Sequence, residues 1–136
     1  FNGMDMTYSS WNVDWWGFSI TLFLKGFYIA QTAEESWWVV ESISGTGDTY
    51  QQTPVNHDMV LDRLGLFVQQ DGRNWSNPDH SMFWTRYDIN GNSAIGYAYV
   101  EGVCRGAQGV SVVEDTGFHS WSTGAHESTA SQYRNH

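Results

Sequence analysis

The stretch Gly96–Glu127, GYAYVEGVCRGAQGVSVVEDTGFHSWSTGAHE, carries the densest run of structural signals in the chain. Residues 94–100 (AIGYAYV) and 109–115 (GVSVVED) are short apolar runs bounded by turn residues, which predicts two strands joined by a loop. A helix is predicted to begin near Ser120 or Ser122. The stretch therefore predicts a strand, a loop, a second strand and a helix in succession.

Strand and helix signals also follow one another upstream of this stretch. Residues 19–30 alternate between two faces and predict a strand, and SMFWTRYDI (81–89) predicts another. The segment TPVNHDMVLDRLGLFVQQDG predicts an amphipathic helix with Thr53 as its cap, Pro54 at its first position and its end at the last glycine. The apolar stripe of this helix consists of Val60, Leu61, Leu64, Phe67 and Val68. The order of elements predicts an α/β fold, a mixed sheet with helices packed on it.

The composition is that of a folded, acidic protein. The chain has 136 residues, of which 40% are hydrophobic and 15% charged, which predicts a single domain over residues 1–136 with a real core. A net charge of −9 with six Lys and Arg argues against nucleic acid and anionic membranes as partners. The longest apolar run, Ile20–Ala30, contains Lys25 and is too short to span a bilayer.

The final twelve residues, AHESTASQYRNH (125–136), begin as a zinc-binding helix does, with His126 followed by Glu127. Such a helix binds zinc through two histidines at i and i+4, because these positions share one face, and the adjacent glutamate polarises the metal-bound water. Position i+4 is Ala130. A His-Glu pair alone also fits a solvated helix surface, and that alternative stays open.

Gly96–Glu127 resembles the metzincin zinc endopeptidases of the adamalysin or reprolysin type, particularly the tick salivary metalloproteases. Members of this family pass from a G-x-A-Y-V edge strand, through a cysteine and a G-V-S-V-V-E-D strand, into A-H-E-L-G-H. Further stretches that agree are IAQTAEE (29–35), GTGDTYQQTPVNHDMVLDRLG (45–65) and DHSMFWTRYDI (79–89). The resemblance runs over most of residues 4–127.

This resemblance implies a fold and an activity. The fold is the metzincin upper subdomain: a twisted, mixed but mostly parallel sheet with one antiparallel edge strand and the zinc helix beneath it. Residues 1–136 would then be a partial catalytic domain without the lower subdomain. The activity is that of a zinc metalloprotease, a hydrolase that cleaves peptide bonds in secreted, extracellular proteins. Its partner would be an extended peptide or protein substrate.

The resemblance also assigns roles to individual residues. His126 matches the first zinc ligand, His136 the third, and Glu127 the general base. The edge strand that pairs with an extended substrate is matched by Gly96, Tyr97 and Ala98. Pairing at a strand edge uses backbone hydrogen bonds and therefore tolerates many substrate sequences.

The zinc motif departs from the family pattern H-E-x-x-H-x-x-G-x-x-H. The second ligand falls on Ala130 and the glycine on Tyr133. On an unbroken helix His126 and His136 would stand about 15 Å apart, so the chain must turn between them to share one ion. A left-handed turn at Tyr133 costs about 1–2 kcal/mol. Two histidines leave a tetrahedral site one ligand short, and low zinc occupancy is expected.

Other interpretations stay open beside the enzyme. The chain is alternatively a non-catalytic protein-binding module, or a redesigned scaffold, on the metalloprotease fold. Such a module would bind through an open strand edge or an aromatic surface. The pairs Trp15-Trp16 and Trp37-Trp38 are predicted to be packing or interface residues, and an aromatic ligand platform is the alternative for them. His119 is a conceivable substitute zinc ligand, and Cys104 a conceivable nucleophile. The segment 88–99 begins as a calcium loop does, but it lacks the loop's glycine and its final glutamate, which favours a turn.

Overall fold

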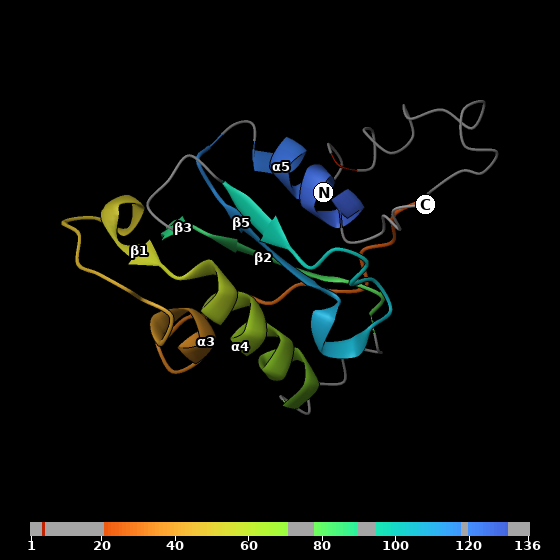
Figure 1. Cartoon of the computed structure of the whole chain (residues 1–136), viewed down its shortest axis with the longest axis horizontal. Coiled ribbons are helices and arrows are strands. Elements are labelled where there is room, and N and C mark those ends of the chain that lie inside the picture. Colours follow the sequence, from red (N-terminus) through yellow and green to blue (C-terminus); the bar gives the residue numbers. More distant parts are fainter. Residues whose placement is uncertain (1–3, 5–20, 71–77, 90–94, 118–119, 131–136) are drawn as a thin grey trace.

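A three-stranded sheet lies between helices on its two faces (Figure 1). The computed structural model describes residue 4 and residues 21–70, 78–89, 95–117 and 120–130. The sheet has the order β2 (Ser81–Thr85), β5 (Val110–Glu114) and β4 (Gly96–Ala98). β2 runs parallel to β5, whereas β4 runs antiparallel to it. A second, two-stranded sheet pairs β1 (Pro54–Val55) with β3 (Asp88–Ile89) in parallel.

The central strand β5 is enclosed on both faces. Val110, Val112 and Val113 have no exposed surface, and neither has Ser111. A strand buried on both faces is typically a continuous apolar run, as the sequence GVSVV is. β5 is therefore the central strand of the sheet, and β4 and β2 are its two outer strands among the described residues.

Two helices cover one face of the sheet. These are α3 (Trp37–Val40) and α4 (His57–Gln70). The 3-10 turn η1 (Tyr50–Gln52) lies between them in the chain, and the 3-10 turn η2 (Gly106–Gln108), which lies between β4 and β5 in the chain, packs against α4. Their core cluster consists of Trp38, Val39, Val55, Val60, Leu61, Leu64, Phe67, Ile89, Val110 and Val112. The amphipathic stripe of α4 supplies four of these side chains, which is why this helix lies flat beneath the sheet. In the described part of the chain, no helix is long and apolar enough to cross a membrane.

The opposite face is covered by α5 (Ser120–Ala130), which packs against β5 and β4 (Figure 1). Gly124 of α5 lies over side chains of β2. A β-carbon there would lie 3.0 Å from the Trp84 ring and 3.1 Å from the Met82 sulfur. The missing side chain leaves room for these two side chains beneath the helix.

The mixed α/β fold predicted from the sequence is confirmed, with parallel and antiparallel strand pairs. The strand predicted over residues 19–30 is wrong across its described part, because residues 21–30 pair with no other strand. Leu22 packs beside Met82 on the α5 side, while Tyr28 packs on Phe67 on the α4 side. The segment thus crosses from one face of the sheet to the other. Alternating side chains predict a strand only where a neighbouring strand offers hydrogen bonds.

The predicted start of the long helix is also wrong. Pro54 lies in β1, and α4 begins at His57. Asn56 caps the helix, since its side-chain oxygen accepts a hydrogen bond of 3.0 Å from the backbone nitrogen of Met59. Proline suits the first position of a strand as well as that of a helix, and asparagine is among the best caps, so two valid start signals competed here.

Two further elements differ from the sequence prediction. The predicted strand 81–89 is divided into β2 and β3 by a bend at Arg86 and Tyr87. The short helix α3 was not predicted at all. Three predicted features lie outside the described residues: the turn at 90–92, the glycine at the end of the long helix, and the helix near the N-terminus except for Met4.

Replacing Gly65 of α4 with alanine tests the contact between this helix and η2. A β-carbon at this position would overlap the carbonyl oxygen of Ala107. Gly65→Ala should lower the free energy of unfolding by about 1–3 kcal/mol, because overpacking outweighs the gain of about 1 kcal/mol in helix propensity. Urea denaturation measures the change. Gln70→Ala on the exposed last turn of α4 is the control, and an equal loss there would contradict the assigned packing.

Candidate functional site

The two candidate residues of α5, His126 and Glu127, differ sharply in burial. His126 is exposed, whereas only 8% of the Glu127 surface is accessible to solvent. Neighbouring helix positions point about 100° apart, so a histidine on the rim places the next side chain against the sheet. The carboxylate that the resemblance assigns as general base is therefore enclosed between α5 and β4.

Glu127 lies directly against the first residue of β4. A β-carbon added to Gly96 would stand 2.7 Å from the Glu127 Cγ atom and 2.8 Å from its Oε1 atom. It would also stand 2.8 Å from the methyl carbon of Thr123. Glycine is thus the residue that fits here. The structure brings together two of the residues singled out in the sequence, one from the helix and one from the strand.

Burial raises the pKa of the Glu127 carboxyl above its usual value, and the neighbouring His126 lowers it in part. Removing a carboxylate from water disfavours its charged form. A carboxyl with a raised pKa exchanges its proton closer to neutral pH, which is the property required of a general acid or base.

The other face of β4 is aromatic and acidic. Tyr97 stacks on the ring of His57, with centroids 4.1 Å apart and planes inclined by 15°. The Tyr99 hydroxyl donates a hydrogen bond to Asp62 of α4. Burial and the adjacent Asp62 carboxylate raise the pKa of Tyr99 well above its usual value. The strand therefore lies between Glu127 on the α5 side and these side chains on the α4 side.

β4 has an open side, which we call the β4 edge: the side of Gly96–Ala98 that faces away from β5. Within the described residues, β5 is the only strand that pairs with it. Tyr97 lies opposite Val112 in the register, and Glu114 donates its backbone N–H to the Ile95 carbonyl, 2.8 Å away. Hydrogen-bonded and non-hydrogen-bonded pairs alternate in antiparallel sheets, so the backbone groups of Gly96 and Ala98 face the open side.

Of the zinc ligands that the resemblance implies, His126 is the one that lies among the described residues. Ala130 is the last residue of α5 and has no donor atom at position i+4 from His126. Searching the described residues finds no group of three His, Cys, Asp or Glu side chains placed to hold a metal ion. His136, Tyr133 and His119 lie outside the described residues.

The remaining sequence candidates have structural surroundings of their own. The exposed Cys104 lies 3.6 Å from Asp79 through its sulfur, and desolvation together with the Asp79 charge raises its pKa, which disfavours a thiolate nucleophile. Asp88 is a strand residue of β3. Trp38 is buried in the core, so its packing role is confirmed, whereas Trp15-Trp16 lies outside the described residues.

Sequence reasoning missed one polar pair. His80 Nε2 lies 2.8 Å from the hydroxyl of Ser111, which has no exposed surface. Burial lowers the pKa of His80 to about 4. The serine cannot reach a substrate, so the pair is structural. The signal that could have revealed it was a lone serine inside the apolar run of β5, which had to find a hydrogen-bond partner.

Comparison of the chain with protein-family models and with curated proteins finds no match. The resemblance to the metzincins therefore stays a prediction from the quoted motifs.

Gly96→Ala tests the contact between β4 and α5. The added methyl group would collide with Glu127 and Thr123, so we expect the free energy of unfolding to fall by about 1–3 kcal/mol. Chemical denaturation gives the value. Combining Gly96→Ala with Glu127→Ala should cost less than the sum of the two single changes, because the second relieves the collision. Gly26→Ala, which adds a methyl group in open space, is the matched control.

His80 should make the protein less stable in acid. Its pKa is about 4 in the folded chain and 6.5 without burial, so between these values the unfolded chain binds more protons. The stabilisation is complete above pH 6.5 and is lost as the pH falls towards 4, by at most about 3 kcal/mol. Urea titrations across this range should show a shallower pH dependence for His80→Gln than for the native chain.

Gln70→Ala, an exposed change that removes no titratable group, is the control for His80→Gln and should keep the native pH dependence. The raised pKa values of the Glu114 and Glu127 carboxyls act in the opposite direction on acidification, and they contribute equally to both chains. Parallel curves for His80→Gln and the native chain would contradict the assigned burial of His80.

Proposed function

We propose that the chain is a peptide-binding domain of the metzincin zinc-endopeptidase type, with a complete binding edge and an incomplete metal site. One observation carries the proposal. The antiparallel edge strand β4 meets the helix α5 at Gly96, where the buried Glu127 carboxylate lies against the strand. A peptide bound at the β4 edge would pass close to this carboxylate.

The β4 edge offers the backbone groups that an extended peptide needs. Gly96 and Ala98 direct their N–H and carbonyl groups away from β5, so a peptide that lies beside β4 can extend the sheet by one strand. Its side chains would then alternate between the α5 face and the α4 face. Main-chain pairing of this kind supplies affinity without requiring one particular sequence.

Glu127 supplies the acid–base group beside the bound peptide. Burial holds its pKa above the usual value, a shift in the direction that favours taking up a proton and returning it. When bound in members of the resembling family, zinc supplies a polarised water. In this chain His126 and His136 are the candidate ligands, and Ala130 stands where a further imidazole would be needed. We expect peptide binding to be retained and hydrolysis to be slow or absent.

A non-catalytic protein-binding module is the second candidate function. Ala130 favours this second candidate, because alanine offers no metal ligand at the position where the resembling family has one, whereas the strand edge is intact. Both candidates share the same partner class, an extended peptide or protein segment, and the resemblance places both outside the cell. They differ in whether zinc at low occupancy supports any cleavage.

Ala130→His tests the metal site. A histidine at i+4 from His126 shares its helix face, so zinc affinity should rise by at least about tenfold, and peptide hydrolysis sensitive to a chelator should appear. Metal content after dialysis and cleavage of a quenched fluorescent peptide measure the two effects. The native chain should retain no more than about a tenth of an equivalent of zinc, as expected for two ligands.

Two control variants separate the causes. Thr129→His places an imidazole one position away from the i+4 face and should leave zinc affinity unchanged. Adding Glu127→Gln to Ala130→His should abolish cleavage but keep the gain in zinc affinity, because the amide cannot accept the proton. An absence of gain with Ala130→His would refute the proposed metal register of α5.

A further inference from the structure

We propose that the β4 edge selects extended peptides with a basic side chain on the face turned towards α4, and that Asp58 and Asp62 provide this selectivity. This inference rests on the proposed function and adds the class of peptide that the edge prefers. It depends on the placement of the two carboxylates, on the absence of a lysine or arginine partner for them among the described residues, and on the open strand beside them.

Asp58 and Asp62 stand on the flank of α4 that faces β4 and its continuation. They are four residues apart, and Gly65 and Gln69 follow on the same flank. A β-carbon on Gly65 would meet Ala107 of η2, and one on Gly106 would lie 3.2 Å from the Gln69 side-chain nitrogen. Since η2 follows β4 in the chain and Tyr99 hydrogen-bonds to Asp62, this flank lies along the α4-facing side of β4 and its continuation.

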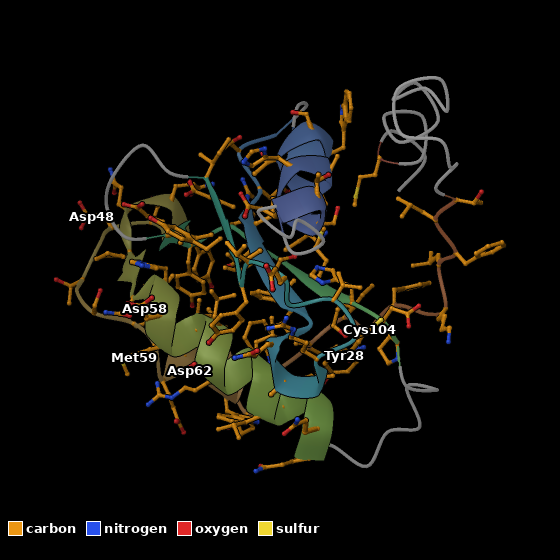
Figure 2. The ribbon with its side chains drawn as sticks, turned by 45° about the vertical axis from the view of Figure 1, so that its right-hand side comes forward. Tyr28, Asp48, Asp58, Met59, Asp62 and Cys104 are labelled. Atoms are coloured by element: carbon orange, nitrogen blue, oxygen red, sulfur yellow. The ribbon has the colours of Figure 1, made fainter. Side chains whose placement is uncertain are left out.

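Asp62 is linked to the β4 segment directly, and Asp58 is linked to it through His57. Asp62 accepts the hydrogen bond of Tyr99, the residue just after β4. Asp58 lies 3.2 Å from His57 Nε2, and the His57 ring stacks on Tyr97 of β4. Figure 2 shows Asp58 and Asp62 side by side on α4 with the exposed Met59 between them in the chain. The charges thus lie next to the strand that would pair with a peptide.

The two negative charges are not neutralised by lysine or arginine within the described residues. The Asp58 side chain is 81% exposed, and its ion-pair partner there is His57. The nearest arginine in sequence, Arg63, is directed to the opposite flank, where it donates to the Glu41 carbonyl. The charges of both Asp58 and Asp62 contribute to the raised pKa of Tyr99, as expected for a negative potential at this point.

A bound peptide would bring its side chains to this potential. A strand added to β4 lies about 4.8 Å from it, and a helix packs about 10 Å below the sheet. Every second side chain of the peptide would point towards α4. A lysine or arginine can cover that distance with its aliphatic stem along Tyr99 and its charge at Asp58 or Asp62. A glutamate in the same place would be repelled.

Two peptides of equal length test the selectivity. One alternates threonine with lysine and the other alternates threonine with glutamate, and both carry a fluorophore and blocked ends. Anisotropy titration of the full chain at low salt should give about tenfold tighter binding of the lysine peptide, as expected for two exposed charge pairs. The preference should disappear in 0.5 M salt, where the Debye length is about 4 Å.

Asparagine variants locate the source of the preference. Asp58→Asn combined with Asp62→Asn keeps the acceptor for Tyr99 and removes both charges, so the two peptides should then bind within about twofold of each other. Glu34→Gln removes one exposed charge in the turn before α3, on the side of α4 opposite to β4, and should keep most of the preference. Circular dichroism checks the fold, and the single variant Asp58→Asn with half the effect replaces the double variant if that one unfolds.

Amide shifts distinguish failure of this inference from failure of the proposed function. Binding at the β4 edge should shift the backbone amides of Gly96 and Ala98, and N-methylation of the peptide should abolish the shifts. If neither peptide shifts them, the proposed peptide-binding function is wrong. If both peptides shift them with equal affinity, or if the lysine preference survives in the double asparagine variant, the charge selectivity alone is wrong.

Discussion

The enclosure of β5 between two helical layers is the constraint on which the remaining structure depends. Its valines touch α4 on one side, and α5 lies against it on the other. A strand with two buried faces cannot shift its register by one residue without exchanging both sets of side chains, so its neighbours are fixed in place. The position of β5 therefore determines the positions of β2 and β4, and it determines which face of α5 packs on the sheet.

The placement of the candidate site follows from this arrangement. With β4 held against β5, the approach of α5 is limited by the bulk at the first β4 residue, and glycine there leaves space that the Glu127 side chain fills. The same packing that removes the carboxylate from water raises its pKa. On the other face, α4 brings its own carboxylates beneath the strand. One short strand is thus flanked by a buried acid and by two solvated ones.

The sequence predicted the elements that bury a regular stripe. The pattern of apolar residues was enough to predict α4, β5 and the short strand at Gly96–Ala98. Prediction from the sequence failed where the structure of a segment depends on partners distant in the chain. Residues 21–30 alternate as a strand does but form no strand pairing. Pro54 lies in β1 because it pairs with Asp88 of β3. The lone serine of β5 indicated that a hydrogen-bond partner was needed, but that His80 is this partner, and that Glu127 contacts Gly96, depends on the three-dimensional arrangement.

The segment 21–30 has a consequence for how the protein behaves in solution. Phe23, Phe27 and Ile29 are largely exposed on it. Exposed apolar side chains gathered on one segment invite association between molecules. The net charge of −9 opposes this by mutual repulsion. Solubility is therefore governed by electrostatics, and concentrated salt or acid, which weaken the repulsion, bring the chain closest to self-association.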